Sequence, residues 1–195
     1  MILHPRSNRN SWATQVIRWN RLSKARSGSI PKSIGGLLIV ACLTNSLPAA
    51  NERIDVSQII TKGEAAAILE EPVKEPSARN GDGAEGYYSK CNYYSVNRGK
   101  SLVVRLQLPG PNAIGPQKEL QLVAAANGAS EKVTGVGDAA QMFAAGGESG
   151  FASRILLLYV AKGSAFMTIG VGGFVDDAVA LEKAKAVAQK LIEHL

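Results

Sequence analysis

Histidine and cysteine, two side chains that often do catalytic or metal chemistry, are scarce in this sequence. The chain has two histidines, His4 and His194, and two cysteines, Cys42 and Cys91. With only His194 beyond the first few residues, neither a histidine-based triad nor a multi-histidine metal site can be built in one chain. We therefore expect no catalytic residue, no metal site and no cofactor, and we interpret His194 as a solvated residue.

Acidic pairs and glycine clusters could suggest an active site, but structural roles explain them better. The neighbouring carboxylates at 70–71 and 176–177 diverge from each other, so we interpret them as helix-end residues. The Gly-Glu-Ser-Gly segment at 147–150 lacks the final glycine of a nucleophile elbow. The glycine clusters at 135–137 and 170–173 predict tight turns rather than phosphate-binding loops.

Positive charge is concentrated at the start of the chain. Residues 1–41 contain seven of the 22 lysines and arginines and none of the 16 acidic residues. The part from Cys42 onward therefore has a formal charge of −1. A near-neutral domain has no excess positive field with which to collect phosphates, so we expect no nucleic-acid partner.

A short apolar run, Ile34 to Ala41, follows this basic segment in the order of a secretory signal. It is too short to span a bilayer, because a spanning helix needs about 20 apolar residues. Residues 39–42, Ile-Val-Ala-Cys, resemble the lipobox of bacterial lipoproteins. In that family the cysteine carries acyl chains such as palmitate, and the peptide is cut before it. The resemblance implies that Cys42 is lipidated and anchors an exported protein to a membrane.

The residues after the cysteine bear on the destination. Leu43 is not the aspartate with which many Gram-negative lipoproteins stay in the inner membrane, so an outer-membrane location is favoured, with the domain facing the periplasm or the cell exterior. The alternative is a soluble secreted protein, cut after Ala49 or Ala50. That cleavage site is poor, because Leu47 or Pro48 would occupy a position that requires a small residue.

We divide the chain into a basic leader and signal peptide at 1–41, a tether at 42–58 and a single domain at 59–195. Thr61 and Glu64 form a capping-box pattern that predicts a helix, which Pro72 stops. A C-terminal amphipathic helix is predicted from Asp176 or Asp177, with acidic residues early and lysines later.

Between these helices the pattern is mainly that of strands. Hairpins are predicted over 87–108 and 154–173, the latter with its turn at 162–163, and a loop is predicted over 76–86 from its composition. Residues 117–128 are read as a helix, although a short strand would also fit. This order predicts an α+β fold with an antiparallel sheet and helices packed on one face.

Four tyrosines lie close together on one predicted strand. Tyr87 and Tyr93 lie on one face, and Tyr88 and Tyr94 lie on the other. One pair is expected in the core, while an exposed pair would favour contact with a glycan or a protein. Plain cross-strand packing is the alternative. We take Tyr88 and Tyr94 as the candidate binding surface.

Cys91 stands on the same predicted strand. We interpret it as a buried, inert thiol, since free cysteine is among the most buried residue types. The alternatives are an intermolecular disulfide in an oxidising compartment or, if Cys42 is retained without lipid, a disulfide between Cys42 and Cys91.

The domain resembles a pattern in small bacterial lipoproteins of unknown function. The likeness covers roughly residues 61–195 and brings no catalytic residues. It rests on a capped helix with Ile-Leu-Glu-Glu-Pro-Val at 68–73, cysteine-x-tyrosine at 91–93, Val-Thr-Gly-Val-Gly-Asp-Ala-Ala at 133–140, a lysine-glycine hairpin at 162–163 and a C-terminal helix.

A second, shorter likeness concerns residues 60–73 alone. This segment is similar to the opening helix of the small lipoproteins of the outer-membrane protein assembly machinery and of β-lactamase-inhibitor-like folds.

These patterns predict a lipid-anchored cell-envelope lipoprotein that acts as a non-enzymatic binding module. Its partners would be the membrane, through lipid on Cys42, and an envelope protein or glycan. The alternative is an envelope enzyme that acts on cell-wall polymer through carboxylates such as Glu85 or Glu148.

Overall fold

The computed structural model describes residues 53–97, 99–127, 130–145 and 154–195. The predicted leader, Cys42 and most of the predicted tether lie outside the described residues. No helix in the described part is long and apolar enough to cross a membrane. The elements are α2 (Val56–Ile59), α3 (Lys62–Leu69), β1 (Ser77–Gly83), β2 (Gly86–Tyr94), β3 (Ser101–Pro109), α4 (Pro116–Asn127), β4 (Glu131–Val133), β5 (Ala139–Ala145), β6 (Ile155–Lys162), β7 (Ala165–Gly172) and α5 (Asp177–Ile192).

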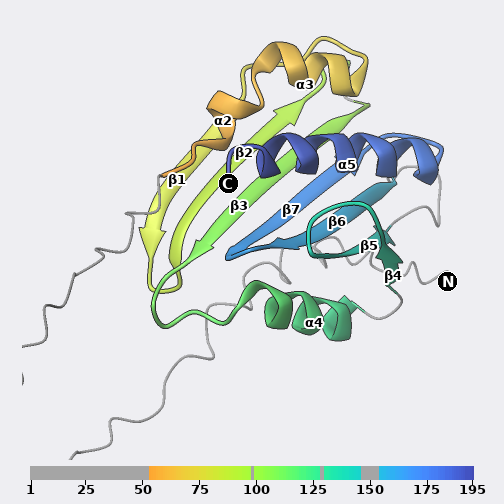
Figure 1. Cartoon of the computed structure of the whole chain (residues 1–195). Coiled ribbons are helices and arrows are strands. Elements are labelled where there is room, and N and C mark those ends of the chain that lie inside the picture. The colour runs from red at the N-terminus through yellow and green to blue at the C-terminus, as the bar shows by residue number, and fades with distance from the viewer. Residues whose placement is uncertain (1–52, 98, 128–129, 146–153) are drawn as a thin grey trace, which may run out of the picture. The chain divides into compact units, whose positions relative to one another are not determined.

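The seven strands form one antiparallel sheet in the order β1-β2-β3-β7-β6-β5-β4 (Figure 1). The predicted α+β class, with its antiparallel sheet and C-terminal helix, is confirmed. Both predicted hairpins are present as β2–β3 and β6–β7.

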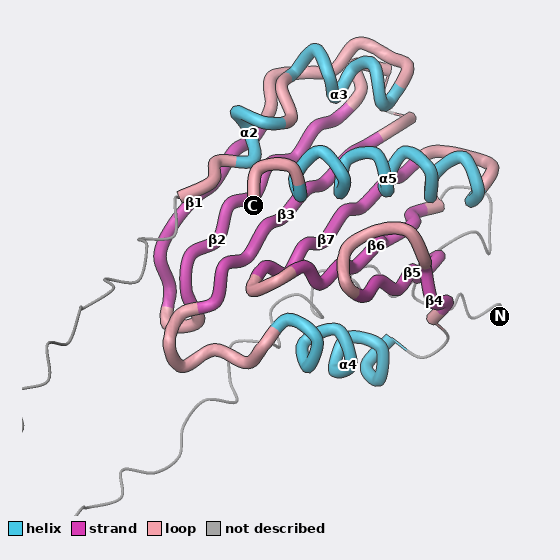
Figure 2. Tube along the Cα trace, in the orientation of Figure 1, coloured by secondary structure: helices cyan, strands magenta, loops and turns pink. Residues whose placement is uncertain are grey.

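The main core lies between the sheet and α5, which crosses β7 and β6 (Figure 2). Inward residues of the strands alternate with outward ones, as a sheet with one apolar face requires. On α5 the apolar stripe predicted from the sequence is buried: Ala180, Ala184, Val187, Ala188 and Leu191. Short α2 and α3 extend this core over β2 and β3.

Helix α4 lies on the opposite face of the sheet, which differs from the expectation that all helices pack on one face. Its buried residues Leu120 and Val123 cluster with Phe143, Ala161 and Phe166, which alternate along their strands with residues of the main core. The strands β5, β6 and β7 are apolar on both sides, so they can bury a helix on each.

Local sequence signals explain where the helices begin and end. Thr61 and Glu64 form the predicted capping box at the start of α3, and Glu70 adopts a left-handed conformation just after its end. Asp176 caps α5 through the backbone amide of Ala178. Asp55 caps α2 in the same way, so folded structure begins inside the range expected as tether.

The loop predicted over 76–86 is wrong, because residues 77–83 form β1. This strand pairs with β2 from Ser77 opposite Asn92 to Gly83 opposite Gly86. Its polar, glycine-rich composition is typical of a loop, yet it suits an exposed edge strand that is held mainly by backbone pairing. Tertiary pairing therefore overrode local propensity here.

Candidate functional site: the open face of β1, β2 and β3

The side of β1, β2 and β3 that points away from α5 is polar and aromatic, and we call it the open face. In the described part of the chain, α4 packs on β5, β6 and β7, and this side of β1 and β2 stays accessible to solvent. Strand alternation determines which residues of β2 belong to it. They are Tyr88, Lys90, Asn92 and Tyr94.

Three basic residues form a row across the open face, which we call the basic row. The strand register places Arg79 of β1 opposite Lys90 of β2, and Lys90 opposite Arg105 of β3. Arg79 and Arg105 are exposed, and Lys90 is half-buried. None of the open-face positions of these three strands carries a carboxylate.

The cations of this row form no ion pairs, unlike most other described cations. Eight other lysines and arginines of the described residues form ion pairs with carboxylates, all outside the open face: Arg53, Lys62, Lys100, Arg154, Lys162, Lys183, Lys185 and Lys190. Within the same described ranges, Arg79, Lys90 and Arg105 form none, and neither do the separate lysines Lys74, Lys118 and Lys132. The open face is therefore a local positive patch on a domain without excess positive charge.

Tyr88 is held in place by its neighbours on β1 and β3. Its ring lies beside Gly81, where a β-carbon would stand 3.6 Å from the ring atom Cε1. On β3 the guanidinium carbon of Arg105 is 5.8 Å from the ring centroid, within the range of a cation–π contact. Arg105 also donates a hydrogen bond of 3.1 Å to Gln107. Ring and guanidinium thus form a preorganised pair.

The other end of the open face carries Asn92 and Tyr94. Tyr94 is 48% exposed, so its ring is accessible to a partner. The amide oxygen of Asn92 is enclosed and has no hydrogen-bond partner among the described residues. Along the strand, Tyr88 and Tyr94 are six residues apart, about 20 Å, with Lys90 and Asn92 between them.

Helix α4 contributes one acidic neighbour at the border of this face. Burial raises the pKa of the Glu119 carboxyl, whereas the charge of Arg105 lowers it and that of Glu85 raises it further. Arg105 is therefore partly balanced by a carboxylate at the border of the open face.

The second tyrosine pair lies on the face that α5 covers. Tyr93 is fully buried, and its hydroxyl donates a short hydrogen bond to the carbonyl of Ile60. Tyr87 is half-buried and donates to the carbonyl of Ile54 at 3.1 Å. Burial raises the pKa of both hydroxyls, so these tyrosines are structural.

Cys91 lies between them in the same core and is fully buried as a free thiol. Burial raises its pKa, which keeps the sulfur in its unreactive protonated form. A thiol with no exposed surface cannot meet a second chain without unfolding, so the intermolecular disulfide loses its support. Cys42 lies outside the described residues.

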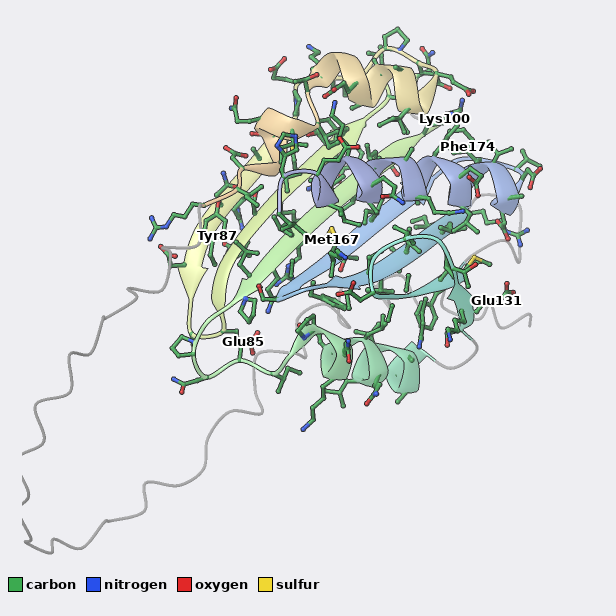
Figure 3. All side chains as sticks on the ribbon, in the orientation of Figure 1. Glu85, Tyr87, Lys100, Glu131, Met167 and Phe174 are labelled. Atoms are coloured by element: carbon green, nitrogen blue, oxygen red, sulfur yellow. The ribbon has the colours of Figure 1, made fainter. Side chains whose placement is uncertain are left out.

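The acidic pairs have the structural roles expected of them. Glu70 accepts a hydrogen bond of 2.7 Å from Lys183, and this contact lowers the pKa of its carboxyl. Lys100 donates to the carbonyl of Leu69 at 2.9 Å and lies 4.6 Å from the ring centroid of Phe174 (Figure 3). The pair at 176–177 caps α5 and binds Arg154 at 2.6 Å.

The predicted turn at 135–137 is present, whereas at 170–173 the prediction is wrong for Gly170 and Gly172, which pair within β7, and only Gly173 leaves the strand. Gly135 and Gly137 have positive φ, and a side chain on Gly137 would meet Val160 at 2.4 Å. Gly173 also has a positive φ, and a β-carbon there would lie 2.0 Å from the carbonyl oxygen of Gly99. These glycines allow close packing of loops against strands.

The remaining candidates for chemistry do not come together. Glu85 is exposed in the turn between β1 and β2, His194 is exposed after the end of α5, and Glu148 lies outside the described residues. The described ranges contain no group of three or more histidines, cysteines or carboxylates that could hold a metal ion. A shallow groove of about 690 Å³ between α3 and α5 is lined mainly by alanine, valine and isoleucine.

The sequence pointed to Tyr88 and Tyr94 but missed the basic row. The alternation of β3 already showed that Arg105 points away from the apolar face. Arg79 was missed because the segment around it was predicted to be a loop. A usable signal was the short turn after Gly83, which joins this segment to a strongly predicted strand.

Comparison of the chain with protein-family models and with curated proteins gives no match.

Proposed function

We propose that this chain is a lipid-anchored cell-envelope protein that binds an envelope component through its open face without catalysing a reaction. The observation that carries the proposal is the open face itself, where two accessible tyrosines flank a row of cations that form no ion pairs within the described ranges. Amphipathic rings and arginines are enriched where proteins bind partners.

The sequence supports the anchor. Residues 39–42 resemble a lipobox at the end of a basic and then apolar leader, and Leu43 favours the outer membrane where the host has one. Two or three acyl chains, at about 0.8 kcal/mol per buried methylene, would hold the protein at a membrane without further contacts. About a dozen residues then separate Cys42 from α2 in the sequence.

The chemistry of the described residues favours binding over catalysis. The thiol of Cys91 is buried, and the carboxylates at 70–71 and 176–177 are engaged at helix ends. A catalytic site needs a nucleophile or base within reach of a substrate, together with groups that orient it. The open face instead offers rings, guanidinium groups and amides.

The anchor is tested by the mass of the N-terminal peptide after expression of the full gene in a bacterial host. We expect a peptide that begins at Cys42 and carries diacylglycerol, and we expect its loss in Cys42→Ser. An unmodified peptide that begins near Asn51 would contradict the anchor and support a soluble secreted protein.

The binding role is tested by purifying the protein from solubilised envelopes. We expect a defined envelope component to co-purify and to be lost with the double change Tyr88→Ala and Tyr94→Ala. A matched control changes two exposed apolar residues elsewhere, Leu122→Ala and Val175→Ala, and should keep the component. Hydrolysis of cell-wall polymer by the pure protein, abolished by Glu85→Gln or Glu148→Gln, would contradict the proposal.

A further inference from the structure

The basic row has the geometry of a site for a polymer with regularly spaced negative charges. Adjacent strands lie about 4.8 Å apart, so Arg79, Lys90 and Arg105 are spread over about 10 Å perpendicular to the strands. Arginine binds a carboxylate with two parallel hydrogen bonds, and lysine acts as a point charge. The row therefore suits several anionic groups in line.

The tyrosines and amides on both sides of the row add groups that recognise uncharged parts of a ligand. Tyr88 is fixed against Gly81 and Arg105, so little order must be imposed on it when a ligand binds. Tyr94 is exposed further along β2, about 13 Å from Lys90. Rings, amides and cations together match a chain of sugar rings that carries hydroxyls and carboxylates.

We propose that the open face binds an acidic polysaccharide, with its carboxylates on Arg79, Lys90 and Arg105 and a sugar ring on Tyr88. This inference rests on the proposed binding role of the same face. Charge complementarity argues for this occupant, since these three cations stand side by side across the strands without ion-pair partners in the described ranges.

Other occupants fit the face less well. A lipid surface is bound by apolar side chains that insert between headgroups, whereas most positions beside the row are polar or small. They are Ser77, Gly81, Asn92 and Gln107, together with Tyr88 and Val103. Protein interfaces are depleted in lysine, and Lys90 stands at the centre of the row.

The test uses the full chain in a neutral detergent, with polygalacturonate, which carries one carboxylate per ring, as the probe and neutral dextran as its counterpart. We expect calorimetric binding of polygalacturonate that weakens as salt is added, and no binding of dextran. Equal binding of both polymers, or of neither, would overturn the inference.

Two charge variants separate the basic row from a general effect of charge. The triple change Arg79→Gln, Lys90→Gln and Arg105→Gln should weaken binding by about tenfold or more. The control, which removes the same charge by Lys62→Gln, Lys132→Gln and Lys185→Gln away from the open face, should stay within about twofold. Equal loss in both variants would overturn the proposal, with unchanged thermal unfolding showing that each is folded.

The ring contact is tested with Tyr88→Ala. Polygalacturonate binding should weaken severalfold in this variant. The unchanged protein should bind a single-stranded DNA oligonucleotide or phosphatidylglycerol vesicles more weakly than it binds polygalacturonate. Tighter binding of DNA or vesicles than of polygalacturonate would overturn the inference. If no acidic glycan binds but the tyrosine variants still lose an envelope component, the polysaccharide inference fails and the proposed function stands.

Discussion

Tyr93 connects α2 to the sheet from inside the core. It is fully buried, and its hydroxyl donates to the carbonyl of Ile60 at the end of α2. Burial raises the pKa of the hydroxyl, with the neighbouring Cys91 acting in the same direction, because a phenolate there would be poorly solvated. The residue therefore has to remain neutral in the folded protein.

Replacing Tyr93 by phenylalanine should lower the free energy of unfolding by about 1–2 kcal/mol at neutral pH, because the Ile60 carbonyl loses its donor. The pH dependence should change as well. A group whose pKa is raised by folding contributes fully to stability below its unfolded-state pKa, which is near 10 for tyrosine. This contribution is lost as the pH rises toward the folded-state pKa.

Above about pH 10 the wild type should therefore lose about 1.4 kcal/mol more per pH unit than Tyr93→Phe. Urea unfolding between pH 7 and 11 measures both slopes. Parallel slopes would show that Tyr93 ionises in the folded state.

Asp138 is the opposite case, a carboxylate whose ionised form is favoured. Lys162 donates to it at 2.9 Å and the amide of Gly163 at 2.7 Å, and these contacts lower its pKa. Its stabilising effect is present above the unfolded-state pKa of about 3.8 and is lost as the pH falls through the lower pKa of the folded state.

Asp138→Asn should accordingly lower the thermal midpoint at pH 7, since the turn between β6 and β7 loses its acceptor. The two proteins should unfold at more similar temperatures near pH 3. A difference that is independent of pH would show that the charge of Asp138 has no part in stability.

At the scale of elements, a buried serine joins three segments. Ser89 on β2 accepts a hydrogen bond of 2.8 Å from the amide of Val56 on α2 and donates one of 2.6 Å to Asn80 on β1. Because β1 has few apolar contacts, this link supports the edge strand that carries Arg79.

Ser89→Ala should lower the free energy of unfolding by about 1–3 kcal/mol, because the buried amide of Val56 loses its acceptor. Hydrogen exchange should show the loss of protection first in β1 and α2. The matched control is Ser77→Ala at the exposed start of β1, which should change stability by less than about 0.5 kcal/mol. A similar effect of both changes would contradict the linking role.

Local signals predicted most elements but not their pairing or their side of the sheet. The capping box at Thr61, the alternation of 102–108 and the stripe of α5 depend on neighbouring residues, so they could be read directly. Strand β1 and the position of α4 depend on partners far along the chain, and composition does not specify these partners.

At the scale of the whole molecule, small residues set the distance between α5 and the sheet. Ala184 and Ala188 are fully buried against the strands. Close packing at such positions leaves no space for a longer side chain. The arrangement of the main core therefore depends on alanine at these positions.

Ala184→Leu should lower the free energy of unfolding by about 1–3 kcal/mol through overpacking. Ala186→Leu makes the same change in helix propensity at an exposed position of the same helix, so it should have little effect on stability. Denaturant unfolding of both variants checks the prediction, and equal stability of the two would show that α5 packs loosely.

The sequence alone determined the separation of a basic segment from a near-neutral remainder, the helix caps, the hairpins and the opposite orientation of the two tyrosine pairs. Each of these is a property of neighbouring residues, set by charge, backbone preference or the two-residue period of a strand.

Only the tertiary structure decided which tyrosine pair is buried, because a strand has two equivalent sides until helices cover one of them. In this chain α2 and α5 cover the side of Tyr87 and Tyr93. The basic row also exists only in the folded sheet, since Arg79, Lys90 and Arg105 become neighbours through the register of three strands. Register depends on the combined burial and pairing of whole strands, which no local pattern contains.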